Sequence, residues 1–215
     1  MEVSADLIAL ARKMRMSTDV RKAIFCAVMG AEDYSEASRE LAKLAPQLRP
    51  PQDREIVRVI FECCTQEKTF NPYYAALLRS VCAAHGAGNH AYTLRFSFWD
   101  LLKDADATSR RKLENAAALL VSLLLDVAPR IGWECIKPVE WLALKEHPGQ
   151  RLFLRQFCTA MLASPRCKVT VGALRARADL ATVQEGLSLF SERHLPGDMA
   201  AAMSVVLPPP SIVGR

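Results

Sequence analysis

Long hydrophobic runs are scarce in this sequence. The longest apolar stretch without a charge, residues 116–125, is far shorter than the roughly 20 residues that a membrane-spanning helix needs. The first sixteen residues, MEVSADLIALARKMRM, contain Glu2 and Asp6 and too short an apolar run for a secretory signal. We therefore expect a protein of the cytosol or nucleus, with no membrane partner.

Cysteine pairs are also missing. The seven cysteines are scattered without a C-x-x-C pair, and their odd number argues against a disulfide framework and for reduced thiols in an intracellular protein. Cys63 and Cys64 are adjacent in a helical pattern and would point in different directions, so that with Cys82, His85 and His90 they complete no tetrahedral ligand set. We interpret such cysteines as small buried hydrophobes and expect no metal and no cofactor.

No catalytic constellation can be found either. Glu62 with Glu67, and Asp100 with Asp104, place carboxylates near one helical face, but the polar faces of solvated helices produce such pairs routinely. No histidine or nucleophile is placed beside them by a motif. The sequence thus predicts a protein that is not an enzyme and has no small-molecule substrate.

The length and the charge are unexceptional. A chain of 215 residues is long enough for one well-buried core, and we expect one domain. The 28 basic residues exceed the 23 acidic ones by five, and this modest excess is compatible with RNA or with an acidic protein partner but requires neither.

Strand alternation is nearly absent and is confined to Lys168–Val171, whereas apolar residues recur at helical spacing almost throughout. We expect an all-α fold of stacked antiparallel helical hairpins, similar to HEAT repeats. Residues 1–16 form an N-terminal extension, 17–195 the helical domain and 196–215 a Pro-rich flexible tail. The expected helices run from caps at 17–19 to about 30, then over 34–44, 50–66, 72–86, 91–104, 109–127, 139–146, 149–163 and 182–194.

A helix-to-helix corner stands out within QEKTFNPYYA, residues 66–75. Asn71 can cap the following helix, and Pro72 occupies the first helical position, where proline is tolerated because its missing N–H would be unpaired anyway. Glu67 and Lys68 are expected to project from the exposed end of the preceding helix. The corner is therefore predicted to be a turn in a binding domain and not an active site.

Two basic clusters indicate a possible RNA contact, although a solvated helix face is an equally ordinary explanation for such runs. Cations at a helix start are disfavoured by the helix dipole by roughly 0.3 to 1 kcal/mol each, and a phosphate backbone would offset this effect. The candidate RNA-binding residues are Arg110, Arg111 and Lys112 in one cluster and Arg12, Lys13, Arg15, Arg21 and Lys22 in the other.

Five blocks in fixed order carry a family resemblance: RMSTDVRKAIFC, GAEDYSEA, QEKTFNPYYA, FSFWDLLKD and VQEGLSLF. From about Met14 to His194 the chain resembles the MI domain of the nucleolar protein family that pairs this domain with a middle domain of the translation-factor-four-G type. No middle domain precedes it in these residues, so that the chain is either a fragment or a relative that lacks it.

The resemblance implies an adaptor in the nucleolus that acts in small ribosomal subunit maturation. Its implied partners are a DEAD-box RNA helicase of the translation-factor-four-A type, ribosome assembly factors and pre-rRNA. An RNA-binding helical module, or an MI-domain factor of splicing or translation, remains the alternative. We expect protein contacts at the corner and at the acidic residues before it, namely Asp53, Glu55, Gln66, Glu67, Lys68 and Asn71.

One short motif is interpreted structurally. Arg58–Phe61 fits the R-V-x-F pattern that docks protein phosphatase one, but such docking needs an extended strand, whereas these residues lie within a predicted helix. Trp99, Trp133 and Trp141 are likewise interpreted as packing residues.

Overall fold

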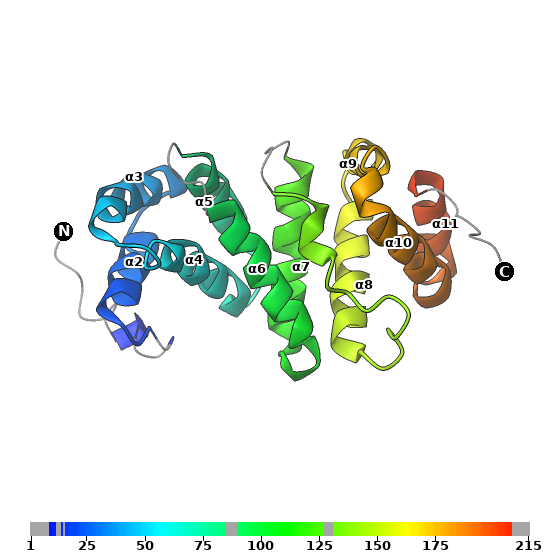
Figure 1. Ribbon diagram of the computed structural model, residues 1–215, viewed down its shortest axis with the longest axis horizontal. Helices are drawn as coiled ribbons and strands as arrows, with labels where there is room; N and C mark the ends of the chain where they lie inside the picture. Colours follow the sequence, from blue (N-terminus) through cyan, green and yellow to red (C-terminus); the bar gives the residue numbers. More distant parts are fainter. Residues whose placement is uncertain (1–8, 12–13, 15, 85–89, 127–130, 208–215) are drawn as a thin grey trace.

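The computed structural model describes residues 9–11, 14, 16–84, 90–126 and 131–207, and every regular element within them is a helix (Figure 1). The chain therefore has the all-α, HEAT-like fold that its hydrophobic spacing predicts. The α-helices are α2 (Asp19–Met29), α3 (Tyr34–Leu44), α4 (Arg54–Gln66), α5 (Pro72–Ala83), α6 (His90–Lys103), α7 (Arg110–Leu125), α8 (Pro148–Leu162), α9 (Cys167–Arg175), α10 (Ala181–His194) and α11 (Gly197–Val206). Short 3-10 helices include η1 (Ala45–Gln47), η2 (Ala105–Ala107), η3 (Trp133–Ile136) and η4 (Ala178–Leu180).

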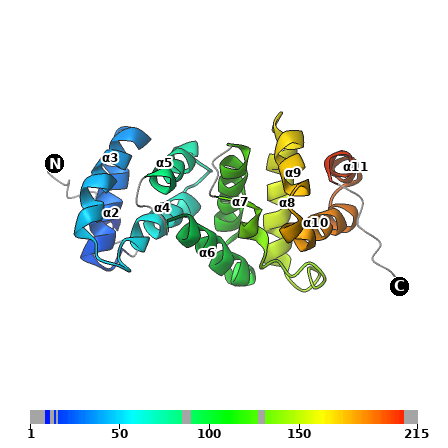
Figure 2. The same cartoon turned by 45° about the horizontal axis from the view of Figure 1, so that its top comes forward.

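The helices form an elongated row that follows the sequence from one end to the other, with the chain termini at opposite ends (Figure 1). In the first half they lie in two layers (Figure 2), because α3, α5 and α7 contact one another in order, as do α2, α4 and α6. The core runs along the whole row and is filled by large side chains that are almost fully buried, including Phe25, Tyr74, Phe98, Phe153, Phe157 and Phe190.

The starts of several helices follow directly from the local sequence. Thr18 caps α2, Asp33 caps α3, and the Asn71 side chain accepts a hydrogen bond from the backbone N–H of Tyr73 at 3.0 Å. Pro72 occupies the first turn of α5. The expected boundaries of α3 and the expected cap at Asn71 are thus confirmed.

The second half departs from simple hairpins, because α7 and α8 run in the same direction. Asp106, just before α7, accepts a hydrogen bond from the Gly149 N–H at the start of α8, at 2.7 Å. At the other end, Arg166 after α8 lies 3.5 Å from Asp126 after α7. Both pairs of ends therefore meet, and the segment between the helices must return along their length.

The predicted helix at 139–146 is wrong, since this return segment consists of η3 followed by turns. Most of its backbone hydrogen bonds join residues three apart, as from the Ala143 N–H to the Glu140 carbonyl. The Gln150 side-chain oxygen accepts a hydrogen bond from the Glu140 N–H, and the Gln150 side-chain nitrogen donates one to the Leu102 carbonyl. Gln150 of α8 thereby holds the segment against α6 and α8. Trp141 is buried in a notch above Gly186 of α10, where any side chain would overlap its ring. Tertiary contacts thus override a helix-compatible sequence.

Two further expectations are corrected near the C-terminus. The strand-like piece at Lys168–Val171 lies in α9, where Val171 is buried and Val169 is exposed. Residues 197–206, expected in a flexible tail, form α11, which packs against α8, α9 and α10 and buries Met203 and Val206. An alanine-rich segment is sufficient to form this helix once its apolar face packs against neighbouring helices.

Candidate partner-binding surfaces

The corner between α4 and α5 is closed from inside the fold. The Tyr74 hydroxyl donates to the Glu67 carboxylate at 2.8 Å, and the Asn115 side-chain amide donates to the Glu67 carbonyl at the same distance. Burial, and then the hydrogen bond to Glu67, raise the pKa of Tyr74, so that the phenol stays protonated. The expectation that Glu67 projects freely is therefore wrong, whereas Lys68 is exposed as expected.

The acidic residues before the corner are also engaged internally. The Glu55 carboxylate forms salt bridges with the guanidinium groups of Arg21, at 2.6 Å, and of Arg58, at 2.8 Å. Arg21 forms a further salt bridge with Glu62. Gln66 donates to Glu62 at 3.0 Å. Glu55 and Arg21, expected to meet protein and RNA respectively, are thus partners of each other in a cluster that ties α2 to α4.

Asp53 and Asn71 differ from each other in their exposure. Asp53 lies at the start of α4 and has one buried carboxylate oxygen without a hydrogen-bond partner within the described part of the chain. Asn71 is exposed, and its side chain serves the cap of α5. Among the six residues expected to bind protein, Lys68 and Asn71 are the exposed ones.

The expected RNA-binding clusters are only partly available. Arg12, Lys13 and Arg15 lie outside the described residues. Lys22 is 3.1 Å from Asp19, and Arg110 at the start of α7 is 2.7 Å from Glu114. Arg111 is exposed and Lys112 is half-buried. The structure brings Arg110–Lys112 together at one helix start but does not join them to Arg21.

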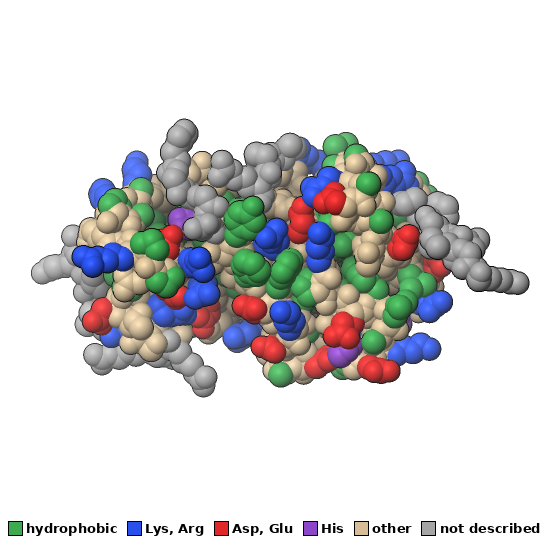
Figure 3. Space-filling view, in the orientation of Figure 1, with side chains coloured by type: hydrophobic (Ala, Val, Ile, Leu, Met, Phe, Trp, Pro, Cys, Tyr) green, Lys and Arg blue, Asp and Glu red, His purple; other side chains and the backbone are tan. Residues whose placement is uncertain are grey.

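A larger surface feature was not anticipated from the sequence. A groove of about 760 Å³ lies between α6, the end of α7, η3 and α9. Figure 3 shows hydrophobic side chains gathered beside basic and acidic ones near the middle of this face. The residues that line the groove include Tyr92, Arg95, Asp126, Glu134, Arg166, Val169 and Arg177.

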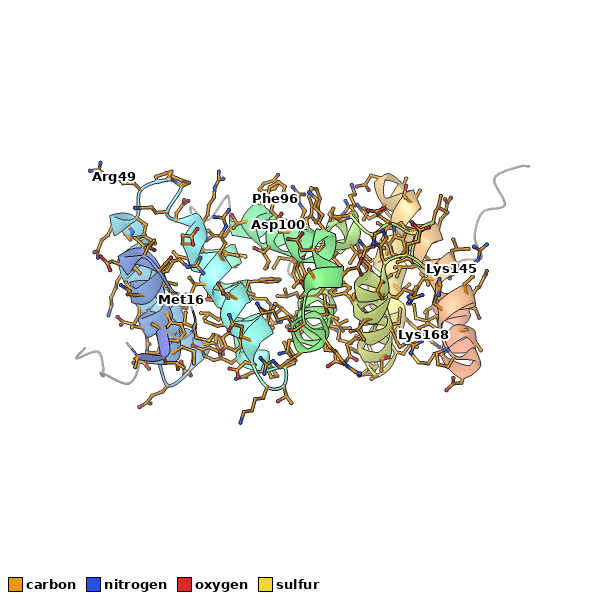
Figure 4. The ribbon with its side chains drawn as sticks, turned by 90° about the horizontal axis from the view of Figure 1, so that it is seen from below. Met16, Arg49, Phe96, Asp100, Lys145 and Lys168 are labelled. Atoms are coloured by element: carbon orange, nitrogen blue, oxygen red, sulfur yellow. The ribbon has the colours of Figure 1, made fainter. Side chains whose placement is uncertain are left out.

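Arg95 organises one wall of this groove. Its guanidinium carbon lies 4.7 Å from the ring centre of Tyr92, 5.5 Å from that of Phe96 and 5.3 Å from that of Trp99. Its Nε is buried without a hydrogen-bond partner among the described residues. The Trp99 Nε1 donates to the Glu134 carbonyl at 2.8 Å, and Phe96 projects outward from α6 (Figure 4). The three aromatic rings therefore hold the guanidinium by cation–π contacts.

The opposite wall carries paired charges. Arg177 bridges Glu134 and Asp179, while Asp126 lies 3.0 Å from Arg79 and 3.5 Å from Arg166. Burial alone would raise the pKa of Glu134, but a backbone N–H and Arg177 hold it below its usual value. The hydrogen bonds to Asp179 and Glu134 raise the pKa of Arg177. Glu134 and Arg177 therefore remain charged, and the ion pairs form a polar rim.

Other candidate sites are structural in this fold. Val59, Ile60 and Phe61 are buried in α4, so that the R-V-x-F motif cannot add a strand to a partner. Cys63, Cys64 and Cys82 are buried, and burial raises the pKa of Cys63 to about 12. The described residues contain no cluster of three or more His, Cys, Asp or Glu suited to a metal ion. Nor do they include a helix long and apolar enough to cross a membrane.

The signal for the groove is present in the sequence but is easily overlooked. Tyr92, Arg95, Phe96 and Trp99 follow helical spacing of three and four residues, so that they share one face of α6. Because Tyr92 and Phe96 are 55% and 47% exposed, that face is not covered by the core. What the sequence cannot show is that η3 and α9 complete the second wall.

Comparisons with known proteins are consistent with this geometry. The MA3 domain, another name for the MI domain, matches residues 20–127, half of the chain. Nucleolar MIF4G domain-containing protein 1 of Mus musculus is 36% identical over 87% of this chain and 21% of its own length. Its Homo sapiens counterpart is 34% identical over 90% of the chain and 22% of its own length. Suppressor of glycerol defect protein 1 of Schizosaccharomyces pombe is 30% identical over 73% and 20%. The chain thus spans about a fifth of these relatives.

Proposed function

Because the chain belongs to the MA3 domain family, we propose that it is a non-catalytic adaptor of the nucleolus that acts in small ribosomal subunit maturation. The printed names of the mouse and human relatives support the nucleolar location. The proposed partner is a DEAD-box RNA helicase of the translation-factor-four-A type, as the family resemblance implies. Further ribosome assembly factors would join through the same module.

The groove between α6 and α9 is the proposed helicase-binding surface, and the Arg95 aromatic cluster is the observation that carries this choice. Arginine, tyrosine and tryptophan are the residue types that dominate protein–protein binding energies. Here Tyr92 and Arg95 line the concave site, and Trp99 lies against Arg95. Two charge pairs surround it, Arg166 with Asp126 and Arg177 with Glu134. This combination of an aromatic centre and a polar rim is typical of protein interfaces.

The corner between α4 and α5 becomes a secondary proposal. Lys68 is exposed and has no structural task comparable to that of Glu67, so that it can contact a partner without disturbing the fold. Rim charges of this kind affect association rates and salt dependence more than the final affinity. We therefore propose Lys68 as a separate, secondary contact and the groove as the main binding surface.

A binding experiment with purified proteins tests the proposal. The 215-residue chain is titrated with a purified nucleolar DEAD-box helicase after nuclease treatment of both. Tyr92→Ala should weaken binding by tenfold or more if the residue is a hot spot, since such residues contribute about 2 kcal/mol or more. Tyr34→Ala is the matched control, because Tyr34 is 45% exposed on α3, outside the groove.

Three results separate the alternatives. Loss of binding by Tyr92→Ala but not by Tyr34→Ala supports the groove. Equal binding by both variants would show that the helicase contacts another surface. If nuclease treatment abolishes binding of the unmodified chain, RNA bridges the two proteins and the adaptor proposal fails.

A further inference from the structure

A cationic hollow lies at the C-terminal half of the row, apart from the groove. It consists of two adjoining depressions, of about 270 and 150 Å³, that share Phe190 and His194 of α10. Arg151 and Arg155 of α8 line the first. Lys145 of the return segment and Arg193 of α10 line the second. Figure 4 labels Lys145 at this end of the row. We call these six residues the α8–α10 cluster.

The four cations of the cluster make no close ion pair, although Arg151 interacts with Asp106 at longer range. Arg151 and Arg155 are four residues apart and thus share a face of α8. Within the described part of the chain, none of the four lies within 4.0 Å of a carboxylate oxygen, whereas Arg110, Arg166 and Arg177 each pair with at least one carboxylate. Like charges gathered without counterions repel one another, and a bound anion would relieve this repulsion.

Two stacked rings form the floor between these cations. The rings of Phe190 and His194 are 5.4 Å apart and inclined by 28°. Phe190 is 1% exposed, while His194 is half-buried and borders both depressions. Burial, and then the charges of Arg151, Lys145, Arg193 and Arg155, lower the pKa of His194. The imidazole is therefore neutral at physiological pH and presents a flat ring without a charge of its own.

Helix capping explains only half of the cluster. Arg155 donates to the His194 carbonyl at 3.4 Å, and Arg193 lies in the last turn of α10, where cations favour the negative end of the helix dipole. Arg151 and Lys145 have no such role. Their positions on either side of the stacked rings therefore call for another explanation.

We propose that the α8–α10 cluster binds single-stranded RNA, with a phosphate held between Arg151 and Arg155 and a base stacked on His194. Arginine matches phosphate geometry with two parallel hydrogen bonds, and cations beside an accessible flat ring are the combination by which proteins hold single strands. An acidic peptide would use the cations but not the ring. The site lies on α8 and α10, so that it does not depend on the helicase groove of α6 and α9.

Fluorescence anisotropy with a labelled single-stranded RNA and the 215-residue chain tests this assignment over a series of salt concentrations. Arg151→Gln should weaken binding about three- to tenfold and reduce the salt slope by about 0.7, the value for one phosphate contact on a single strand. Arg39→Gln is the matched control, since Arg39 is an exposed arginine on α3 at the other end of the row and should leave both quantities unchanged. Unchanged binding by Arg151→Gln, or equal losses in both variants, would overturn the proposal.

The stacking role has a separate readout. His194→Ala should weaken RNA binding at least about fivefold without changing the salt slope, because stacking involves no counterion release. His194→Phe should restore most of the affinity. If His194→Ala does not fold, the salt slope of Arg151→Gln decides alone. Displacement of the RNA by polyglutamate at equal charge concentration would show a general polyanion site and contradict base stacking.

Discussion

Tyr74 and Glu67 are joined by a hydrogen bond of 2.8 Å from the phenolic hydroxyl to the carboxylate, across the turn that links α4 to α5. Tyr74 is almost fully buried, and its aromatic ring also meets that of Tyr73 edge-on at 5.2 Å. The charged corner is therefore half-buried and bonded to a core side chain at one residue, Glu67, and exposed at the next, Lys68.

This difference predicts opposite outcomes for two neighbouring substitutions. Glu67→Ala should lower the free energy of unfolding by about 1 to 3 kcal/mol, because it leaves the buried Tyr74 hydroxyl without its main acceptor. Lys68→Ala should change it by less than about 0.5 kcal/mol, as is usual for exposed residues. Urea denaturation measures both. Equal stability of the two variants would mean that the Tyr74 bond contributes nothing.

The cap of α5 provides a second prediction. Asn71→Ala should lower the free energy of unfolding by about 1 kcal/mol, because the Tyr73 N–H loses its acceptor at the helix start. Asn71→Ser is the control, since serine caps helices about as well as asparagine. If the serine variant were as unstable as the alanine variant, the stability that Asn71 contributes would not come from capping the helix.

Two glycines predict opposite effects of the same substitution. Gly186→Ala should destabilise the fold by about 1 to 3 kcal/mol, because the added methyl group would overlap the Trp141 ring. Gly172→Ala in α9 should stabilise it by about 0.4 to 1 kcal/mol, since that position is open and alanine favours a helix. Thermal or urea denaturation compares the two. A neutral Gly186→Ala would show that the return segment can shift without loss.

The return segment also marks the limit of what the sequence predicts. Caps define α2, α3 and α5 locally, with Pro72 in the first turn of α5, and the Tyr34–Leu44 helix matches its prediction at both ends. The predicted start of α4 at residue 50 is wrong, since α4 begins at Arg54 without a side-chain cap. By contrast, 139–146 has a helix-compatible pattern, and tertiary contacts such as those of Trp141 with Gly186 and of Gln150 with Glu140 keep it in turns. Such contacts join residues tens of positions apart or lie across a loop, and no local pattern encodes them.

The candidate sites likewise combine features that the local sequence shows with features that only the packing of the helices decides. The charges of the corner are evident in the sequence, but whether a carboxylate faces solvent or a buried hydroxyl depends on the packing of α5 against α4. The groove requires α6 and α9, more than 60 residues apart, to face each other. Arg151 and His194 likewise meet only because α10 packs beside α8. Surfaces assembled from distant helices are therefore the part that sequence reasoning misses.

The last prediction concerns pH and two histidines with opposite shifts. His147 lies 2.8 Å from Asp106 and 3.5 Å from Glu140. The hydrogen bond to Asp106, together with the charges of Glu140, Asp106 and Glu146, raises the pKa of His147. The bond to His147 and the Gly149 N–H lower the pKa of Asp106, with a smaller effect of Arg151. At His194 the shift is downward, for the reasons given above.

The signs follow from linkage between protonation and folding. The raised pKa of His147 adds stability below its unfolded value of about 6.5, and this stability is lost as the pH rises through the folded value. The lowered pKa of Asp106 adds stability above about 3.9 that is lost as the pH falls through its folded value. The lowered pKa of His194 has the opposite effect: below about pH 6.5 this residue reduces stability, because its protonation favours the unfolded chain.

Melting temperatures measured from pH 5 to pH 8 therefore distinguish the two residues. The unmodified chain should exceed His147→Gln most at pH 5 to 6, and the difference should shrink toward pH 8 because the neutral imidazole loses its ionic contact with Asp106. Relative to His194→Gln, the unmodified chain should instead become less stable as the pH falls from 7 to 5, because only the histidine gains an unfavourable charge among four cations. Differences that stay constant over this range, or that change in the same direction for both variants, would contradict the opposite environments of the two rings.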